Sequence, residues 1–337
     1  MKNTNNKCLF ILHPNKKSVT NYVRGLQFVG NDCDAIYLLD EDNFTKKKYF
    51  CLIIGTLKNL YSLHRNKNKY SVVVILKPWS LLVSLILLFI FKKKLYIDIN
   101  DPLHLDNFIG EWKFKIYLAI FHKRLIFESK EYLNYCNKRF KITGTLIEDF
   151  SQYDEFPFSS WSQKKRSVIW FGNYGNSYEL IRHIDIIRHF NAQGYQLVVL
   201  GPSKLVIEKL HDNSINFHEI KQKSRASLLN AISKSRFAFI PFNASSDLHT
   251  LRGNLKVKFA MAGGCCVLAS NLLMHRRLIN HGRNGFLFND TINASEINEI
   301  IECKKLKMIS ENAKKTILTL GTKKQHFEKF LKLNALT

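Results

Sequence analysis

The sequence predicts an α/β protein built from two doubly wound, parallel-sheet domains in tandem. Its 337 residues are too many for one ordinary core and too few for three. Short, fully apolar runs alternate with helix-length segments, as in a parallel sheet covered on both faces. The alternation stops between residues 148 and 165 and then restarts. Since such sheets bind ligands at the carboxyl ends of their strands, we expect two Rossmann-like domains facing a cleft.

The first domain is expected over residues 1–150, with helices at Ser18–Phe28 and Lys113–Phe121. Its strands are expected at Cys8–Leu12, Ala35–Leu39, Phe50–Gly55, Ser71–Leu76, Leu95–Ile99, Arg124–Phe127 and Thr145–Ile147.

A linker is expected over 151–165, because this stretch is rich in Ser, Phe and charged residues and has no clear period. The second domain is expected over 166–310, with strands at Ser167–Phe171, Gln196–Leu200, Ile215–Phe217, Phe237–Pro241 and Cys266–Ala269. Residues 311–337 are expected to form helices that could pack back on the first domain.

The charge balance is strongly basic. Lys and Arg number 51 against 27 Asp and Glu, a formal net charge of +24. Such a surplus suits nucleic acid, an anionic membrane face or phosphate-bearing small molecules, unless it only reflects a Lys- and Asn-rich genome. No zinc-finger or RNA-recognition signature is present, so no nucleic-acid partner is expected.

Cysteine usage and the polar N-terminus favour a reducing cytoplasm. The seven cysteines are scattered, form no C-x-x-C and have no zinc-type spacing, and no signal peptide is expected. Pro78–Phe91 is apolar and followed by three lysines, but a spanning helix needs about 20 apolar residues. A buried core helix is favoured over an interfacial one. The alternative is a peripheral position on the inner face of the membrane.

Two segments of the second domain suit phosphate chemistry. Gly172 and Asn173 lie in a G-x-x-G turn between a strand and a helix, where free N–H groups favour an anion. Arg252, Asn254 and Lys256 lead into a short helix of small apolar residues. Cations at a helix start oppose its dipole, and a bound diphosphate would offset that cost. The alternative is that they are solvated surface cations.

The stretch KVKFAMAGGCCVLAS followed by LINHGRNGFLFND resembles the C-terminal signature of GT-B glycosyltransferases, around glycosyltransferase family four. LYIDINDP and LIFESKEYL resemble two segments of the same family's N-terminal domain, so the resemblance covers most of residues 70–290. The residues that match the C-terminal signature are Lys256, Ala260, Met261, Ala262, Gly264, Val267, Ala269, Ser270, Ile279, Gly282, Asn284, Gly285, Phe286 and Leu287.

This resemblance implies a metal-independent glycosyltransferase of surface-polysaccharide synthesis, such as capsule or O-antigen, with a UDP- or GDP-sugar as donor and no cofactor. The acceptor would be a glycan or a lipid-linked glycan. The nucleotide sugar would dock on the second domain, its base near Glu219 and Ile220. Its diphosphate would lie against Gly172, Asn173, Arg252, Asn254 and Lys256.

The sequence departs from the family pattern at two places. The family's E-x7-E pair, which handles the donor sugar and ribose, falls on Leu251 and Phe259. The glycine-rich loop after the first strand is replaced by residues 13–17, HPNKK. An inactive relative is therefore an alternative.

Candidate catalytic and acceptor-side residues follow two strands of the first domain. Asp101 or His104 could serve as the base toward an acceptor hydroxyl. Asp98 lies inside the strand and is either acceptor-side or a buried structural acid. Glu128 and Ser129 follow the next strand, where Ser129 could equally be a helix cap.

Residues 40–42, DED, imitate a D-x-D metal motif but are interpreted as a solvated acidic loop, so no metal site is expected.

Two other functions remain open. One is a GT-B sugar-nucleotide epimerase, which would need acids around the donor sugar. The other is a basic module that binds polyanions without catalysis.

Overall fold

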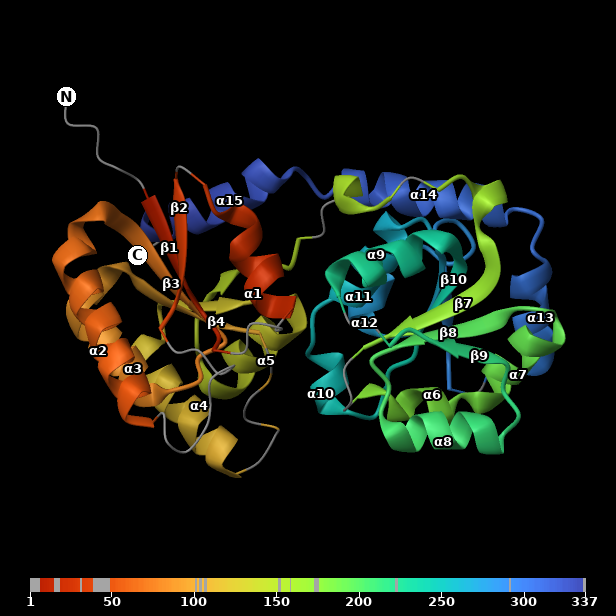
Figure 1. Ribbon diagram of the computed structural model, residues 1–337, viewed down its shortest axis with the longest axis horizontal. Helices are drawn as coiled ribbons and strands as arrows, with labels where there is room; N and C mark the ends of the chain where they lie inside the picture. Colours follow the sequence, from red (N-terminus) through yellow and green to blue (C-terminus); the bar gives the residue numbers. More distant parts are fainter. Residues whose placement is uncertain are drawn as a thin grey trace. The chain divides into compact units, whose positions relative to one another are not determined.

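The computed structural model describes residues 7–14, 19–30, 32–38, 49–100, 102, 105, 108–150, 153–157, 159–172, 176–221, 224–290 and 292–335. The chain forms two compact units (Figure 1). The N-terminal unit comprises Met1–Phe150, Leu251–Gly253 and Lys323–Thr337, and the C-terminal unit comprises Ser151–Thr250 and Asn254–Thr322.

The N-terminal unit is built on a parallel sheet of order β2-β1-β3-β4-β5-β6. The central strands are buried at nearly every residue, as their apolar runs predict. The strands are β1 (Lys7–Leu12), β2 (Cys33–Tyr37), β3 (Tyr70–Leu76), β4 (Leu95–Ile99), β5 (Leu125–Phe127) and β6 (Thr145–Leu146).

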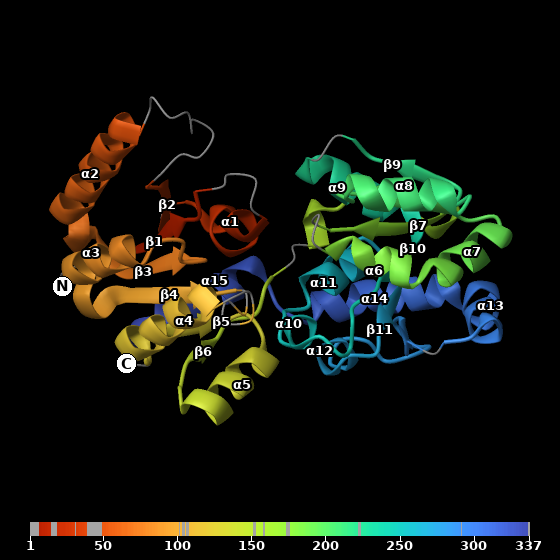
Figure 2. The ribbon, with the colours of Figure 1, turned by 90° about the horizontal axis from the view of Figure 1, so that it is seen from below.

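Helices cover both faces of this sheet. On one face, α2 (Tyr49–Asn66), α3 (Leu81–Phe91), α4 (Phe108–Phe121) and α5 (Lys130–Phe140) share one core cluster with the strands. On the other face, Phe28, Phe330 and Leu333 pack around Phe10. This second core brings the short 3-10 helix Leu26–Phe28, which follows α1 (Val19–Arg24), together with α15 (Lys323–Leu331) from the other end of the chain (Figure 2).

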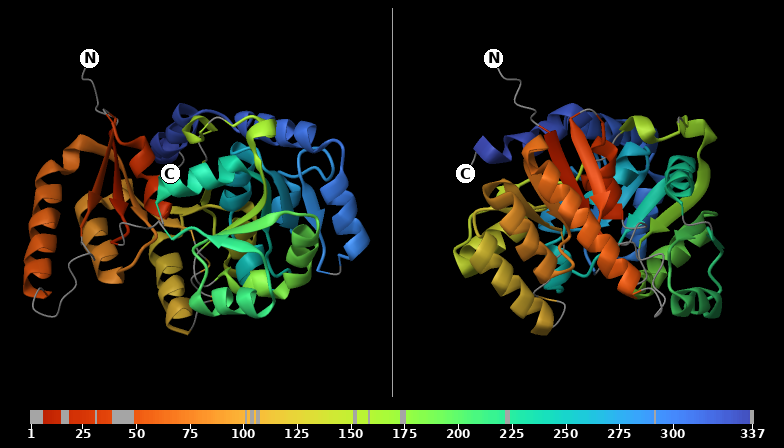
Figure 3. Two further views of the ribbon diagram at one scale, coloured as in Figure 1. Left: turned by 45° about the vertical axis from the view of Figure 1, so that its right-hand side comes forward. Right: turned by 60° about the vertical axis from the view of Figure 1, so that its left-hand side comes forward.

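The C-terminal unit has a second parallel sheet, of order β12-β11-β10-β7-β8-β9. Its strands are β7 (Lys165–Phe171), β8 (Gln196–Leu200), β9 (Phe217–Glu219), β10 (Ser235–Ile240), β11 (Cys266–Ser270) and β12 (Phe286–Phe288). Its helices are α6 (Tyr178–Arg182), α7 (Ile184–Ala192), α8 (Lys204–Asp212), α9 (Arg225–Lys234), α10 (Asp247–Thr250), α11 (Leu255–Ala262), α12 (Leu273–Arg276), α13 (Ala294–Glu302) and α14 (Leu306–Leu318), several of them visible in Figure 3.

Serine and asparagine side chains fix where helices begin. Ser129 and Ser203 each accept a backbone N–H three residues on, at 3.0 and 3.2 Å. Asn293 forms a reciprocal capping box with Glu296 at the start of α13. Each cap satisfies a donor that the first helical turn leaves unpaired.

Three expectations are corrected. The expected strand Phe50–Gly55 lies inside α2, because a short apolar run suits a strand or a helix and this one continues in helical period to Asn66. The strand β12 was not predicted. The expected linker ends early, because β7 already begins at Lys165.

Pro78–Phe91 forms α3 after a turn, and Ser80 caps the helix. Leu87 and Phe91 are buried against the sheet, but Leu82 and Phe89 on the outer side are 68% and 80% exposed. The helix therefore covers the core without being buried all round. Within the described residues, no helix has the length and apolar character needed to cross a membrane.

Candidate ligand-binding site of the C-terminal unit

The order of the strands places a crevice at the carboxyl ends of β7 and β10. From β7 the chain winds outward to β8 and β9, and it then returns to β10 on the other side of β7. Doubly wound sheets bind ligands at such a switch point. The segments that follow these two strands begin with Gly172 and Pro241.

Lys256 of α11 lies at this switch point. Its Nζ is 5.3 Å from the ring centroid of Trp170 and 5.3 Å from that of Phe242. A Cβ added to Gly172 would lie 2.8 Å from the same Nζ. The three residues therefore hold one cation where the ends of β7 and β10 meet.

Phe242 is itself held in place by residues from β11 and α12. Its N–H donates to Ser270 Oγ at 2.7 Å, and its ring stacks on His275 at 5.6 Å. His275 is fully buried and donates from Nδ1 to the Ser270 carbonyl at 2.7 Å. Its Nε2 has no hydrogen-bond partner within the described part of the chain.

The His275 imidazole is neutral at physiological pH. Burial, with a smaller contribution from the Lys256 charge, lowers its pKa to about 4, against the raising effect of its bond to Ser270. Nε2 is therefore an acceptor, and Lys256 carries the positive charge of this cluster.

Two glycines allow the backbone to close up beside this cation. Gly172 N–H donates to the Leu200 carbonyl at 3.1 Å, extending the pairing of β7 and β8. Gly201 has a φ of +86°, and a Cβ there would lie 2.1 Å from the Gly172 carbonyl oxygen. A side chain at position 201 would thus force the two strand ends apart.

The other predicted donor residues belong to other elements of the chain. Asn254 precedes α11 and donates from Nδ2 to the Met274 carbonyl at 2.8 Å. Arg252 belongs to the N-terminal unit, and Asn173 lies outside the described residues. Glu219 ends β9, and the Ile220 N–H is already used by the Val199 carbonyl at 2.9 Å. A base near Ile220 would therefore meet its carbonyl rather than its N–H.

The predicted catalytic pair, Asp101 and His104, lies outside the described residues, as does the D-x-D imitation at 40–42. Within the described part of the chain, no cluster of three His, Cys, Asp or Glu side chains could hold a metal ion.

Asp98 is a buried partner of Arg24. The guanidinium donates to both carboxylate oxygens, with 2.9 Å between Nη2 and Oδ1, and also to Asp149 at 3.0 Å. Burial raises the pKa of Asp98 to about 6, although Arg24 opposes that rise. Of the two roles that the sequence left open, the geometry favours the structural one.

Glu128 and Ser129 both contact the segment Leu251–Gly253. Glu128 accepts the Gly253 N–H at 3.2 Å, and Ser129 Oγ donates to the Leu251 carbonyl while capping α5. A Cβ on Gly253 would lie 3.3 Å from the Glu128 carboxyl carbon. These polar groups hold backbone that arrives from a distant part of the chain.

The two positions where the family carries acids are apolar packing positions here. Leu251 joins the core of the N-terminal unit. Phe259 is 2% exposed and packs edge-on against Phe156, with Arg225 over its other face. Leucine and phenylalanine at these positions are thus explained by packing.

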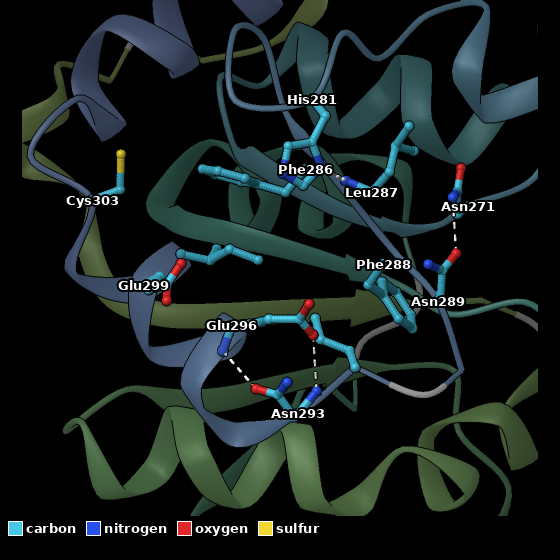
Figure 4. Close-up of a pocket in the computed structure, with 12 residues that line it drawn as sticks. Asn271, His281, Phe286, Leu287, Phe288, Asn289, Asn293, Glu296, Glu299 and Cys303 are labelled. Carbon is cyan, nitrogen blue, oxygen red and sulfur yellow. Dashed lines mark hydrogen bonds between the residues drawn. The ribbon is translucent and has the colours of Figure 1, made fainter.

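A cavity of about 670 Å³ lies elsewhere in the C-terminal unit, between β12 and α13 (Figure 4). Glu296 and Asn293, which line it, are committed to the cap of α13. None of the predicted donor residues lines this cavity.

Sequence reasoning missed the aromatic part of the site. Trp170 and Gly172 are two residues apart at the end of a strand, and this spacing places both on the same face of the sheet. The sequence therefore offered a signal for Trp170. Ser270 matched the family signature without an assigned role. Phe242 and His275 had no comparable signal, because only the order of the strands brings them to Lys256.

The two Rossmann-like units define a protein of the GT-B fold, and solved structures of that fold are similar to the whole chain. HepE of Anabaena, in complex with UDP and glucose, has a TM-score of 0.67 at 14% identity, covering 98% of this chain and 97% of that one. A glycosyltransferase from Rickettsia africae has a TM-score of 0.66 at 15% identity, with 97% of both chains covered.

S. aureus TarM, in a complex that includes UDP, has a TM-score of 0.63 at 15% identity. The match covers 82% of this chain but only 58% of the TarM chain. No protein-family model matches the sequence, and no curated protein matches it significantly.

Proposed function

We propose that the protein is a glycosyltransferase that moves a sugar from a nucleoside-diphosphate donor to a glycan or lipid-linked acceptor. The observation that carries the proposal is Lys256 Nζ, held at the switch point of the C-terminal sheet over Trp170 and Phe242. HepE and TarM, which share the fold, were solved with UDP, so a uridine donor is the first to test and a guanosine donor the second.

The chemistry proposed for the site is stabilisation of the departing diphosphate. Lys256 and the positive end of the α11 helix dipole would both face the negative charge that develops on the leaving group. Gly172 would let the phosphates approach the end of β7 closely. This electrostatic role requires no metal ion, and we keep metal independence as part of the proposal.

The acceptor side remains a proposal as well. Asp101 or His104 would act as the base, a role in surface-polysaccharide synthesis is expected, and a lipid-linked acceptor would place the protein at the inner face of a membrane.

Lys256→Met tests the donor site. It removes the charge and keeps most of the apolar stem over the two rings, so UDP or GDP should bind roughly 10- to 100-fold more weakly, the usual effect of losing a charge-assisted bond. Isothermal titration calorimetry with each nucleoside diphosphate, with and without EDTA, gives the affinity directly.

Lys204→Met is the matched control, because Lys204 lies on the same unit and is 91% exposed. Equal affinity of wild type and Lys256→Met for every nucleoside diphosphate would refute the donor site. Nucleotide binding that leaves a nucleotide sugar epimerised rather than transferred would refute the transferase activity instead.

A further inference from the structure

The outer face of one helix layer in the N-terminal unit carries exposed apolar side chains. The helices α2, α3 and α4 cover the same face of the sheet, and their inward residues share one core. The outward residues Leu57, Tyr61, Leu82, Phe89 and Trp112 are between 58% and 80% exposed. We call the outward side of these three helices the outer helix face.

The apolar character of α3 goes beyond what the fold needs. Its sequence, LLVSLILLFIF, has a single polar residue, whereas a helix that covers a sheet needs only one apolar side. Leu82, Leu85 and Phe89 are spaced by three and four residues, so they form one stripe on the outer side. Packing against the sheet does not account for this stripe.

The stripe continues onto α4 because the two helices are neighbours at both ends. Lys113 Nζ donates to the carbonyls of Pro78 and Trp79, at 3.0 and 3.1 Å. At the other end Arg124 donates to the Lys92 carbonyl at 3.0 Å. The segment of α4 that carries Trp112 is therefore a neighbour of the start of α3.

Cations gather at one edge of the outer helix face. These helices run parallel, so their C-terminal ends share an edge, and each is followed by basic residues. In the described part of residues 49–124, the acidic residues are Asp98, which is buried, and Glu111, which is paired with Lys115 at 2.9 Å. The cations after the three helices are Lys67, Lys69, Lys92, Lys93, Lys94, Lys123 and Arg124.

We propose that the outer helix face docks the protein on an anionic lipid surface. Its apolar side chains would enter the boundary between headgroups and acyl chains, while the edge of cations meets the anionic headgroups. A second copy of the chain fits less well, since the described acidic residues of this stretch, Asp98 and Glu111, are buried or already paired and offer a partner copy's cations no carboxylate. Nucleic acid would leave the leucine and phenylalanine side chains without an apolar partner.

Such docking would leave the ligand edge of the N-terminal sheet free, because helix C-termini lie at the opposite edge from the carboxyl ends of the strands. The inference extends the lipid-linked acceptor that forms part of the proposed function. Its test needs neither nucleotide nor catalysis.

The experiment is co-sedimentation of the full chain with vesicles of phosphatidylcholine, alone or mixed with phosphatidylglycerol, at low and high salt. Wild type should bind the mixed vesicles, and high salt should weaken that binding. The double variants Leu82→Gln with Phe89→Gln, and Lys92→Glu with Lys93→Glu, should each bind at least about 10-fold more weakly.

Matched controls come from the C-terminal unit. Leu205 and Leu318 are 53% and 57% exposed, and Lys304 and Lys305 are a second exposed pair of lysines. Leu205→Gln with Leu318→Gln, and Lys304→Glu with Lys305→Glu, should bind vesicles as wild type does. Unchanged melting temperatures would show that each variant is folded.

Three results would overturn the inference. They are no binding of wild type to mixed vesicles, equal losses in variants and controls, and a change of oligomeric state in the Leu82→Gln and Phe89→Gln double variant with its vesicle binding intact. Lys256→Met should bind vesicles normally. If the wild-type protein binds vesicles but no nucleotide, the proposed donor site is wrong and the proposed membrane-docking face is still supported.

Discussion

At the scale of single residues, His275 is the most strongly perturbed group beside the candidate site. Its pKa of about 4 means that the folded protein binds no proton there until well below the ordinary histidine pKa of 6.5. Between those two pH values, His275 is protonated in the unfolded chain and neutral in the folded chain. Stability contributed by neutral His275 is therefore present above pH 6.5 and lost as the pH falls toward 4.

Replacing this histidine should reduce the loss of folding stability at acid pH. His275→Gln keeps an N–H donor for the Ser270 carbonyl but cannot titrate, so its unfolding free energy should lose about 3 kcal/mol less between pH 7 and pH 4 than that of wild type. Urea unfolding at several pH values measures this difference.

His122→Gln is the control, since His122 is exposed at the end of α4. Parallel pH profiles for wild type and His275→Gln would show that His275 does not titrate in this range.

Asp98 affects the pH dependence of stability in the opposite direction to His275, over a pH range that overlaps with it. Its pKa is raised from 3.8 to about 6, so the folded chain holds the proton more tightly than the unfolded one. The cost of its ionisation therefore appears as the pH rises through that interval and is constant above it. Burial is the main reason that this acid keeps its proton longer, and the charge of the nearby Asp149 carboxylate adds to it.

At the scale of elements, a buried lysine ties three chain segments together. Lys164, before β7, is 3% exposed and donates from Nζ to the carbonyls of Ser233, Ser235 and Gly263, at 2.6, 3.1 and 2.9 Å. These carbonyls lie at or just beyond the C-terminal ends of α9 and α11, where the helices leave acceptors unpaired. The side chain therefore closes two helix ends at once.

Lys164→Met should destabilise the protein by about 2–4 kcal/mol, because three buried carbonyls lose their donor while only part of that cost is regained by removing a buried amine. Chemical unfolding measures the loss. Lys165→Met is a close control, since Lys165 is the next residue and is exposed. Equal stability of the two variants would mean that water or a neighbouring group satisfies those carbonyls.

The elements also show what could be predicted from sequence. Gln196–Leu200 was predicted to the residue, because its apolar run is bounded by Gly194 and Gly201, both at positive φ. Phe50–Gly55 was predicted wrongly, because its β-type composition is overridden by the helical period that follows it. Lys256 and Gly172 were grouped for phosphate chemistry and do meet. Phe242 and His275 could not be added, because contacts across strands depend on sheet order.

At the scale of the molecule, neither compact unit is one continuous stretch of chain. Residues 251–253 and 323–337 belong to the N-terminal unit, although they follow the C-terminal unit's first strands in sequence. Sequence reasoning suggested that the final helices could return, but a local pattern carries no information on which unit a three-residue segment such as 251–253 joins. The N-terminal core is thus completed only by the last residues of the chain.

Phe330 gives this arrangement a measurable consequence. Its side chain is fully buried, meets Phe10 edge-on at 5.0 Å and lies under the Arg24 guanidinium at 5.8 Å. Phe330→Ala should cost about 3–5 kcal/mol, the usual range for a buried aromatic. The loss should fall on the N-terminal unit, so hydrogen exchange followed by mass spectrometry should show faster exchange in β1 and β3 and unchanged exchange in β7 and β8.

Leu318→Ala, at the exposed end of α14, is the comparison variant and should change neither set of strands. Faster exchange in both sheets of Phe330→Ala would mean that the two units unfold as one cooperative body. Unchanged exchange in β1 would mean that α15 is not part of the N-terminal core. The expected pattern is confined to one sheet because Phe330 contacts Phe10, Arg24 and Phe28, which all belong to the N-terminal unit.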